Sequence, residues 1–281
     1  MKLKSIICLS TAVLTSANLT ASALPPSLIT RQSGKVKAEI SQLKVVQNNG
    51  KEGWSAFEEI SGLAEVTLRL EINRGGKINF TKTLSAMYRS GDLPREFRII
   101  DLDGDKEPEV FVTLLSEIGS ATHANLSTSI YKYQPQKSTY SETDISWENF
   151  GYEIKDLDKN GIPEFISVDN RFKESLGLCT ICVSPPIRIW QYRKGQMVDV
   201  TRRYPKAIRS NAYTIWREYE QVRSNKQHAK GKLAGYLATK YLLNESEDGW
   251  RRIKQAYQES DRTSFFNDLR ALLREKGYIP K

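Results

Sequence analysis

The stretch IIDLDGDKEPEVFV, residues 99–112, determines how the rest of this chain is interpreted. Its run of Ile and Val, typical of a strand, is interrupted by five acidic side chains at alternate positions from 101 to 109. Acidic groups this close together repel each other unless a positive charge lies among them. A second stretch, EIKDLDKNGIPEFISV at 153–168, repeats the arrangement. The sequence therefore predicts two equivalent acidic loops, each of which needs a cation.

The acidic residues are spaced as a calcium loop requires. Alternate residues of a tight loop point inward, so oxygens at positions 1, 3 and 5 converge, and a backbone carbonyl at 7 and a carboxylate at 9 complete the shell. Calcium takes about six to eight oxygen ligands in a flexible geometry, whereas magnesium prefers a water-rich octahedron. We therefore expect Ca²⁺ as a structural ion that pins each hairpin. The side chains at positions 1, 3, 5 and 9 are Asp101, Asp103, Asp105 and Glu109 in the first loop, and Asp156, Asp158, Asn160 and Glu164 in the second.

A simpler interpretation is that these segments are ordinary turns, in which Asp and Asn side chains cap their own backbone. That interpretation accounts for one such residue in each turn. It does not account for three or four oxygen-bearing side chains at odd spacings, twice in one chain.

The acidic loops belong to an internal repeat. Residues 95–150 and 151–201 each predict a four-stranded antiparallel meander, with Ile130-Tyr131-Lys132-Tyr133 in the first unit matching Ile189-Trp190-Gln191-Tyr192 in the second. The 33–84 segment alternates apolar and polar residues around a Gly75-Gly76 turn, which predicts a hairpin. It is either a degenerate third unit or an unrelated flank.

The hydrophobic period changes after Pro205. Apolar residues recur at helical spacing in four segments, the last of which ends at Gly277. The expected fold class is α+β, with propeller-blade-like antiparallel β-meander repeats over 24–201 and a C-terminal helical module over 202–281.

The N-terminus predicts export. Lys2 and Lys4 precede an apolar run, and Ala21-Ser22-Ala23 has the form of a signal peptidase site, so residues 1–23 are expected to be a cleaved signal peptide. No later run of apolar residues is long enough for a transmembrane helix. A periplasmic, extracellular or cell-surface location is expected.

Export favours a disulfide between Cys179 and Cys182, the two cysteines that follow the signal. Free thiols, a metal site and a redox role remain open. A redox motif would need a helix that begins at the first cysteine, but Pro185-Pro186 follow the pair.

The helical module is basic, with 18 Lys and Arg against 9 Asp and Glu over residues 202–281. Such charges usually form a solvated helix face. They could instead bind an anionic polysaccharide or lipid headgroup, whereas export disfavours nucleic acid. The candidate anion-binding residues are Lys226, Lys230, Lys232, Arg251 and Arg252.

The loops DLDGDKEPEV and DLDKNGIPEF resemble the calcium loops of FG-GAP and VCBS-type repeats, the blades of integrin α-subunit propellers. The resemblance implies the side-chain ligands named above and backbone ligands at Glu107 and Ile162. This chain departs from that pattern in having Gly104 at position 4 and Glu at position 9. A closed propeller needs about four to eight blades, so two or three units imply a partial stack or a small sandwich. The segments GYEIKDLD, GIPEF and MVDVTRRYP also resemble exported cyanobacterial proteins of uncharacterised function.

Catalytic motifs are missing from the sequence, which has no nucleophile elbow, zinc-protease motif or phosphate-binding glycine loop. Its two histidines, His123 and His228, lie in polar segments. The leading hypothesis is an exported, non-catalytic protein that binds a protein or polysaccharide and is stabilised by calcium. The alternatives are a cell-envelope hydrolase of unrecognised type and a surface anchor that binds anions through the basic helices.

Overall fold

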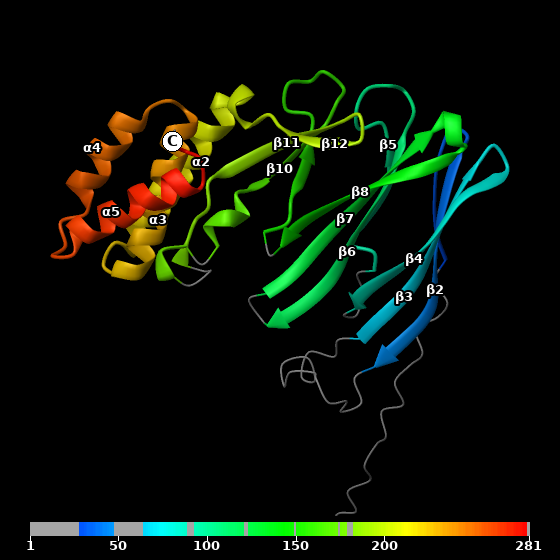
Figure 1. The fold of residues 1–281 in the computed structure, drawn as a ribbon, viewed down its shortest axis with the longest axis horizontal. Helices are drawn as coiled ribbons and strands as arrows, with labels where there is room; N and C mark the ends of the chain where they lie inside the picture. Colours follow the sequence, from blue (N-terminus) through cyan, green and yellow to red (C-terminus); the bar gives the residue numbers. More distant parts are fainter. Residues whose placement is uncertain are drawn as a thin grey trace, which may run out of the picture.

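The computed structural model describes residues 28–47, 64–88, 93–120, 123–148, 150–173, 175–178 and 182–279. The predicted signal peptide at 1–23 and Cys179 lie outside these residues. Within them, twelve strands form three four-stranded antiparallel sheets, and four α-helices follow (Figure 1). The predicted α+β class is confirmed.

In each sheet the strands pair in sequence order, as in a simple meander. Sheet A contains β1 (Leu28–Ser33), β2 (Val36–Gln47), β3 (Ala64–Arg74) and β4 (Lys77–Tyr88). Sheet B contains β5 (Glu96–Ile100), β6 (Glu109–Ser120), β7 (His123–Gln134) and β8 (Thr139–Glu148). Sheet C contains β9 (Glu153–Lys155), β10 (Glu164–Val168), β11 (Ile187–Arg193) and β12 (Gln196–Asp199). Sheets B and C correspond to the two predicted meanders.

Sheet A includes the described residues of the 33–84 segment, whose relation to the repeats the sequence left open. It is a third meander, in which Gly75 and Gly76 form the β3–β4 turn with positive φ at both residues. This turn geometry matches the twist of paired strands and favours glycine. The first hairpin of sheet A has the short turn of Gly34 and Lys35, where sheets B and C have an acidic loop.

The three sheets and the helices pack in layers. Successive side chains of a strand point to opposite faces of its sheet, so a sheet can pack against a neighbour on each face. Val66, Leu68 and Leu70 of sheet A join Val110 and Val112 of sheet B in one core. The alternate side chains of sheet B, which include Phe111 and Trp147, pack on Phe165 and Tyr192 of sheet C. The opposite face of sheet C, with Ile189, packs against the helices. Sheet C and the helices therefore share one hydrophobic core.

The helical region contains α2 (Pro205–Val222), α3 (Lys226–Leu242), α4 (Ser246–Ala256) and α5 (Arg262–Glu275). Gly231 and Gly235 of α3 lie directly against the segment that precedes β11. A Cβ atom at Gly235 would be 1.7 Å from the carbonyl oxygen of Ser184. Only glycine permits the backbone of α3 to come this close to the segment before β11, so that segment packs directly on α3.

Candidate functional site

In both acidic loops the aspartate at position 1 accepts hydrogen bonds from backbone N–H groups of its own turn. In the first, Asp101 accepts hydrogen bonds from the backbone N–H groups of Gly104 (2.7 Å) and Lys106 (2.9 Å). In the second, Asp156 accepts them from Asn160 (3.1 Å) and Gly161 (2.8 Å). The carboxylate at position 9 closes each loop, since Glu109 accepts from the N–H of Leu102 and Glu164 from that of Leu157, both at 2.8 Å. The turn-capping bonds of the simpler interpretation are thus present in both loops.

The carboxylates of each loop also converge. Asp101, Asp103 and Glu109 offer oxygens within 4.8 Å of one another, and so do Asp156, Asp158 and Glu164. Glu109 and Glu164 are fully buried. Buried carboxylates of like charge need a positive or hydrogen-bonding partner, and the partner differs between the loops.

In the first loop the partner is Lys132 of β7. Its ammonium lies 2.9 Å from Asp103, 2.6 Å from Asp105 and 2.9 Å from Glu109. Burial alone would lower the pKa of Lys132, but these three carboxylates raise it well above its ordinary value, so the lysine stays charged. Burial raises the pKa of Glu109 to about 7, and the hydrogen bond from Lys132 opposes that rise. The first loop thus has a cation of its own.

In the second loop Gln191 occupies the position of Lys132. Gln191 pairs with Glu164 across β10 and β11, and its amide donates to the Glu164 carboxylate. The Tyr204 hydroxyl donates to the same carboxylate at 2.6 Å. Arg203 lies 3.8 Å from Asp158, and both side chains are partly exposed. Among the residues that the structure describes, no lysine ammonium contacts these carboxylates.

The two loops lie against each other. A Cβ atom at Gly104 would be 2.9 Å from the Ile162 side chain, and the backbone N–H of Lys194 donates to Asp103 at 3.3 Å. The other carboxylate oxygen of Asp103, Oδ1, is buried without a hydrogen-bond partner in the described part of the chain. Loop two and the β11–β12 turn therefore cover loop one.

Glu107, the expected backbone ligand of loop one, has a separate role through its side chain. Its carboxylate forms an ion pair with Arg74 at the end of β3 and lies 3.8 Å from Lys35. The Arg74 guanidinium is stacked 4.1 Å from the centre of the Tyr133 ring. These contacts join sheet A to sheet B.

The candidate anion-binding residues lie on α3 and α4, and four of the five form intramolecular ion pairs. Lys226 contacts Glu259 at 2.6 Å, Lys230 contacts Asp261 at 2.8 Å, and Lys232 lies 3.4 Å from Glu218. Arg251 pairs with Asp248. Arg252 instead stacks 3.8 Å from the centre of the Trp216 ring. Only Arg252 therefore has no carboxylate partner in the described part of the chain.

Cys182 is buried, at 1% exposure. Because Cys179 lies outside the described residues, the disulfide between the two stays a prediction.

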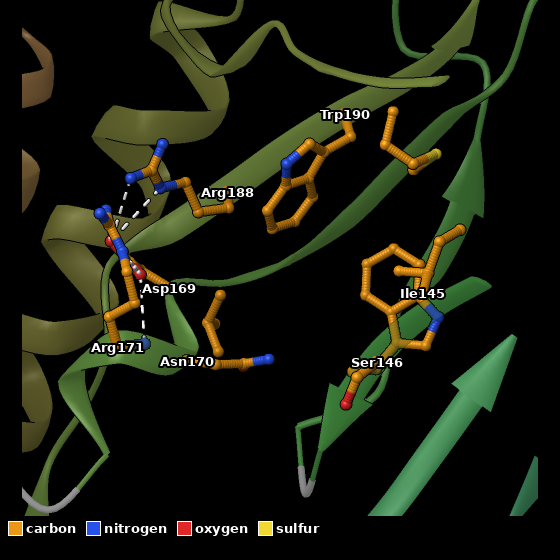
Figure 2. A pocket seen from close by; sticks show the side chains of 10 residues that line it. Ile145, Ser146, Asp169, Asn170, Arg171, Arg188 and Trp190 are labelled. Carbon is orange, nitrogen blue, oxygen red and sulfur yellow. Dashed lines mark hydrogen bonds and ion pairs between the residues drawn. The ribbon is translucent and has the colours of Figure 1, made fainter. Parts of the chain in front are cut away.

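A cavity of about 340 Å³ lies between sheets B and C (Figure 2). Trp190 forms one wall, and Ile145 and Ser146 lie across the cavity from Asp169 and Asn170. In Figure 2 the amide of Asn170 points into the space. Sequence patterns did not predict this cavity, although the polar run Asp169-Asn170-Arg171 directly after a strand was a visible signal.

Asp169 organises one side of this cavity. Its carboxylate accepts hydrogen bonds from Arg171 (2.6 and 2.7 Å), Arg188 (3.1 Å) and Tyr278 (2.9 Å). Burial alone would raise the pKa of Asp169, but these hydrogen bonds and the two guanidinium charges hold it below its usual range. Asp169 is therefore a buried, charged anchor between sheet C and the C-terminal residues.

The C-terminal part of the chain, residues 208–277, matches the family described as the sll0997 C-terminal domain. The matched segment begins within α2 and ends just after α5.

Over most of its length the chain is similar to a probable thylakoid lumen protein, sll0997, of Synechocystis sp.. The two are 22% identical over 93% of this chain and 91% of that protein. The chain is also 26% identical, over 72% of its length, to an uncharacterized protein, y4bJ, of Sinorhizobium fredii, of which the match spans 32%. No solved structure matches the chain. The expected resemblance to cyanobacterial proteins is thus confirmed, whereas the resemblance to FG-GAP and VCBS repeats stays a prediction. Within the described residues, no helix is both long and apolar enough to span a membrane.

Proposed function

We propose that this protein is an exported, non-catalytic binding protein, and that its second acidic loop holds a structural Ca²⁺ ion. The predicted signal peptide supports export, and so does similarity to a protein named as a probable resident of the thylakoid lumen. That analogy supports a location in the lumen or in an equivalent exported compartment. Its ligand is a protein or a polysaccharide.

The observation that carries the calcium proposal is the set of donors in loop two. Asp156, Asp158 and Glu164 converge, and all three offer the hard carboxylate oxygens that calcium prefers. The likeness of DLDKNGIPEF to FG-GAP and VCBS loops supports the same ion, with Asn160 and the Ile162 backbone as further ligands. The Asn160 side chain already accepts the N–H of Ile162 at 2.7 Å, which orders the loop.

The position of loop two gives the ion a role in folding. Glu164 contacts Tyr204 at 2.6 Å, and Tyr204 is the residue directly before α2. Calcium at this loop would neutralise Asp158 and Glu164 and strengthen the connection between sheet C and the helices. Loop one fits the ion less well, because a metal there must displace the Lys132 ammonium from three carboxylates.

Calorimetric calcium titration of the full chain, with thermal melts in calcium and in chelator, tests the proposal. We expect one ion per chain and a melting temperature several degrees higher in calcium, because a ligand that binds only the folded state stabilises it by about 2.7 kcal/mol at 100 times its Kd. Asp158→Asn should abolish both effects, and the matched change in loop one, Asp103→Asn, should leave them in place. Failure to bind millimolar calcium would remove the metal from the proposal.

A further inference from the structure

A separate cavity of about 370 Å³ lies in the helical region, between α2, α3 and α4. In Figure 1 these helices lie at the end of the molecule opposite sheet A. Aromatic and basic side chains line the cavity together, among them Tyr213, Trp216, Arg217 and Arg252. This volume suits a small ligand.

The charges that line this cavity do not cancel. Four basic residues face two acidic ones, Glu220 and Glu245. Glu245 is already engaged by Arg209 at 3.1 Å and by Lys240. Arg217 and Arg252 form no ion pair with any residue that the structure describes. The second acidic residue, Glu220, accepts a hydrogen bond of 2.9 Å from the indole N–H of Trp216. Two guanidinium groups of the cavity are therefore not held in an ion pair with any described residue.

An aromatic ring lies beside each of these two guanidinium groups. The Arg252 guanidinium lies 3.8 Å from the centre of the Trp216 ring and 5.7 Å from that of Tyr236. The Arg217 guanidinium lies 6.0 Å from the centre of the Tyr213 ring. Tyr213 is 64% exposed. A guanidinium stacked on a ring keeps its N–H edges available and loses less conformational freedom when it binds an anion.

We propose that this cavity binds the phosphate group of a phosphate ester, and that Arg217 and Arg252 are the phosphate-binding residues. A phosphate monoester carries a charge of about −1.5 to −2 at neutral pH and has three strong acceptor oxygens. Both properties match two guanidinium forks with an excess of two positive charges. The exposed Tyr213 ring is positioned to contact the organic part of the ester. This inference does not depend on calcium in the acidic loops.

The test is calorimetric titration of the full chain with phenyl phosphate, which supplies a phosphate and a flat ring. We expect Arg252→Gln and Arg217→Gln each to weaken binding about tenfold or more, because each removes a charge-assisted hydrogen bond to the anion. Arg251→Gln is the matched control: it lies next to Arg252 on α4, but its guanidinium pairs with Asp248. Affinity for phenyl phosphate should change less than twofold in this control.

Two further titrations make the outcome decisive. Vesicles of phosphatidylcholine with or without phosphatidylglycerol distinguish a lipid headgroup from a soluble ester: binding only to the anionic vesicles, lost in Arg217→Gln, would assign the lipid. Benzoate supplies a carboxylate on the same ring, and equal binding of benzoate would overturn the preference for phosphate. Equal losses of affinity in Arg251→Gln and Arg252→Gln would overturn the site. So would a failure to bind both phenyl phosphate and the anionic vesicles. Arg217 is exposed, so its variant separates binding from any packing defect at Arg252.

Discussion

The hydroxyl group of Tyr278 donates a hydrogen bond of 2.9 Å to the carboxylate of Asp169, a residue 109 positions earlier in the chain. Asp169 follows β10 of sheet C, and Tyr278 follows α5. Both are buried, at 4% and 6% exposure. The contact fastens the C-terminal residues to the sheet that carries the second acidic loop.

Loss of this hydroxyl should weaken the whole protein. Tyr278→Phe keeps the ring packed on Phe172 but leaves the charged carboxylate with one donor fewer. Hydrogen bonds to charged groups contribute about 1.5–3 kcal/mol, so the free energy of unfolding in urea should fall by roughly 2 kcal/mol. The exposed Tyr213 provides the control, since Tyr213→Phe should change stability by less than about 0.5 kcal/mol. Similar losses in both variants would show that the buried hydroxyl has no special role.

Asp169 should also make stability depend on pH. Its folded pKa lies below the ordinary value of about 3.9, so folding favours the charged form. The resulting stabilisation is present above that value and is lost as the pH falls through the folded pKa. Asp169→Asn should therefore cost about 2 kcal/mol at pH 7, since it removes a buried charge that accepts hydrogen bonds from Arg188, Arg171 and Tyr278. The difference from the wild type in urea unfolding should shrink below about pH 4; a difference that is constant with pH would contradict the assignment.

A reciprocal exchange tests whether Lys132 decides which acidic loop binds calcium. Lys132→Gln gives loop one the residue of loop two, and calorimetry should then find two ions per chain. Gln191→Lys brings an ammonium to Glu164, and no ion should bind. In chelator, Lys132→Gln should melt below the wild type, because Asp103, Asp105 and Glu109 then repel without a counter-charge. Unchanged stoichiometry in both variants would show that the lysine does not control the ion.

Gly235→Ala should destabilise the protein, against the usual preference of helices. Alanine in a helix interior is ordinarily better than glycine by about 1 kcal/mol. Here its Cβ would be 1.7 Å from the Ser184 carbonyl oxygen, which is backbone and cannot move aside cheaply. Overpacking of this kind costs about 1–3 kcal/mol or more. Ser210→Ala, at an exposed position of α2, is the control and should stabilise slightly; a gain in both variants would refute the close contact.

Local patterns were sufficient to predict the sheets and helices. Alternation around Gly75-Gly76 predicted the β3–β4 hairpin, and the change of hydrophobic period after Pro205 predicted the helices. Both features depend on residues close together in the chain. The status of residues 33–84 stayed open because their first turn has no acidic loop, and only the pairing of β1 with β2 identified the third meander.

The sequence by itself determined the two acidic loops, since the spacing of Asp101, Asp103 and Glu109 dictates which oxygens can converge. It could not decide what neutralises them, because Lys132 and Gln191 reach the loops across paired strands. The same limit applies to the basic helices, where composition gave the total charge but not the pairing. Arg251 and Arg252 are neighbours in sequence, yet one faces Asp248 and the other the Trp216 ring. Tertiary structure decides such questions because the energy of a charge depends on the groups within a few ångströms of it, and those groups come from distant parts of the chain.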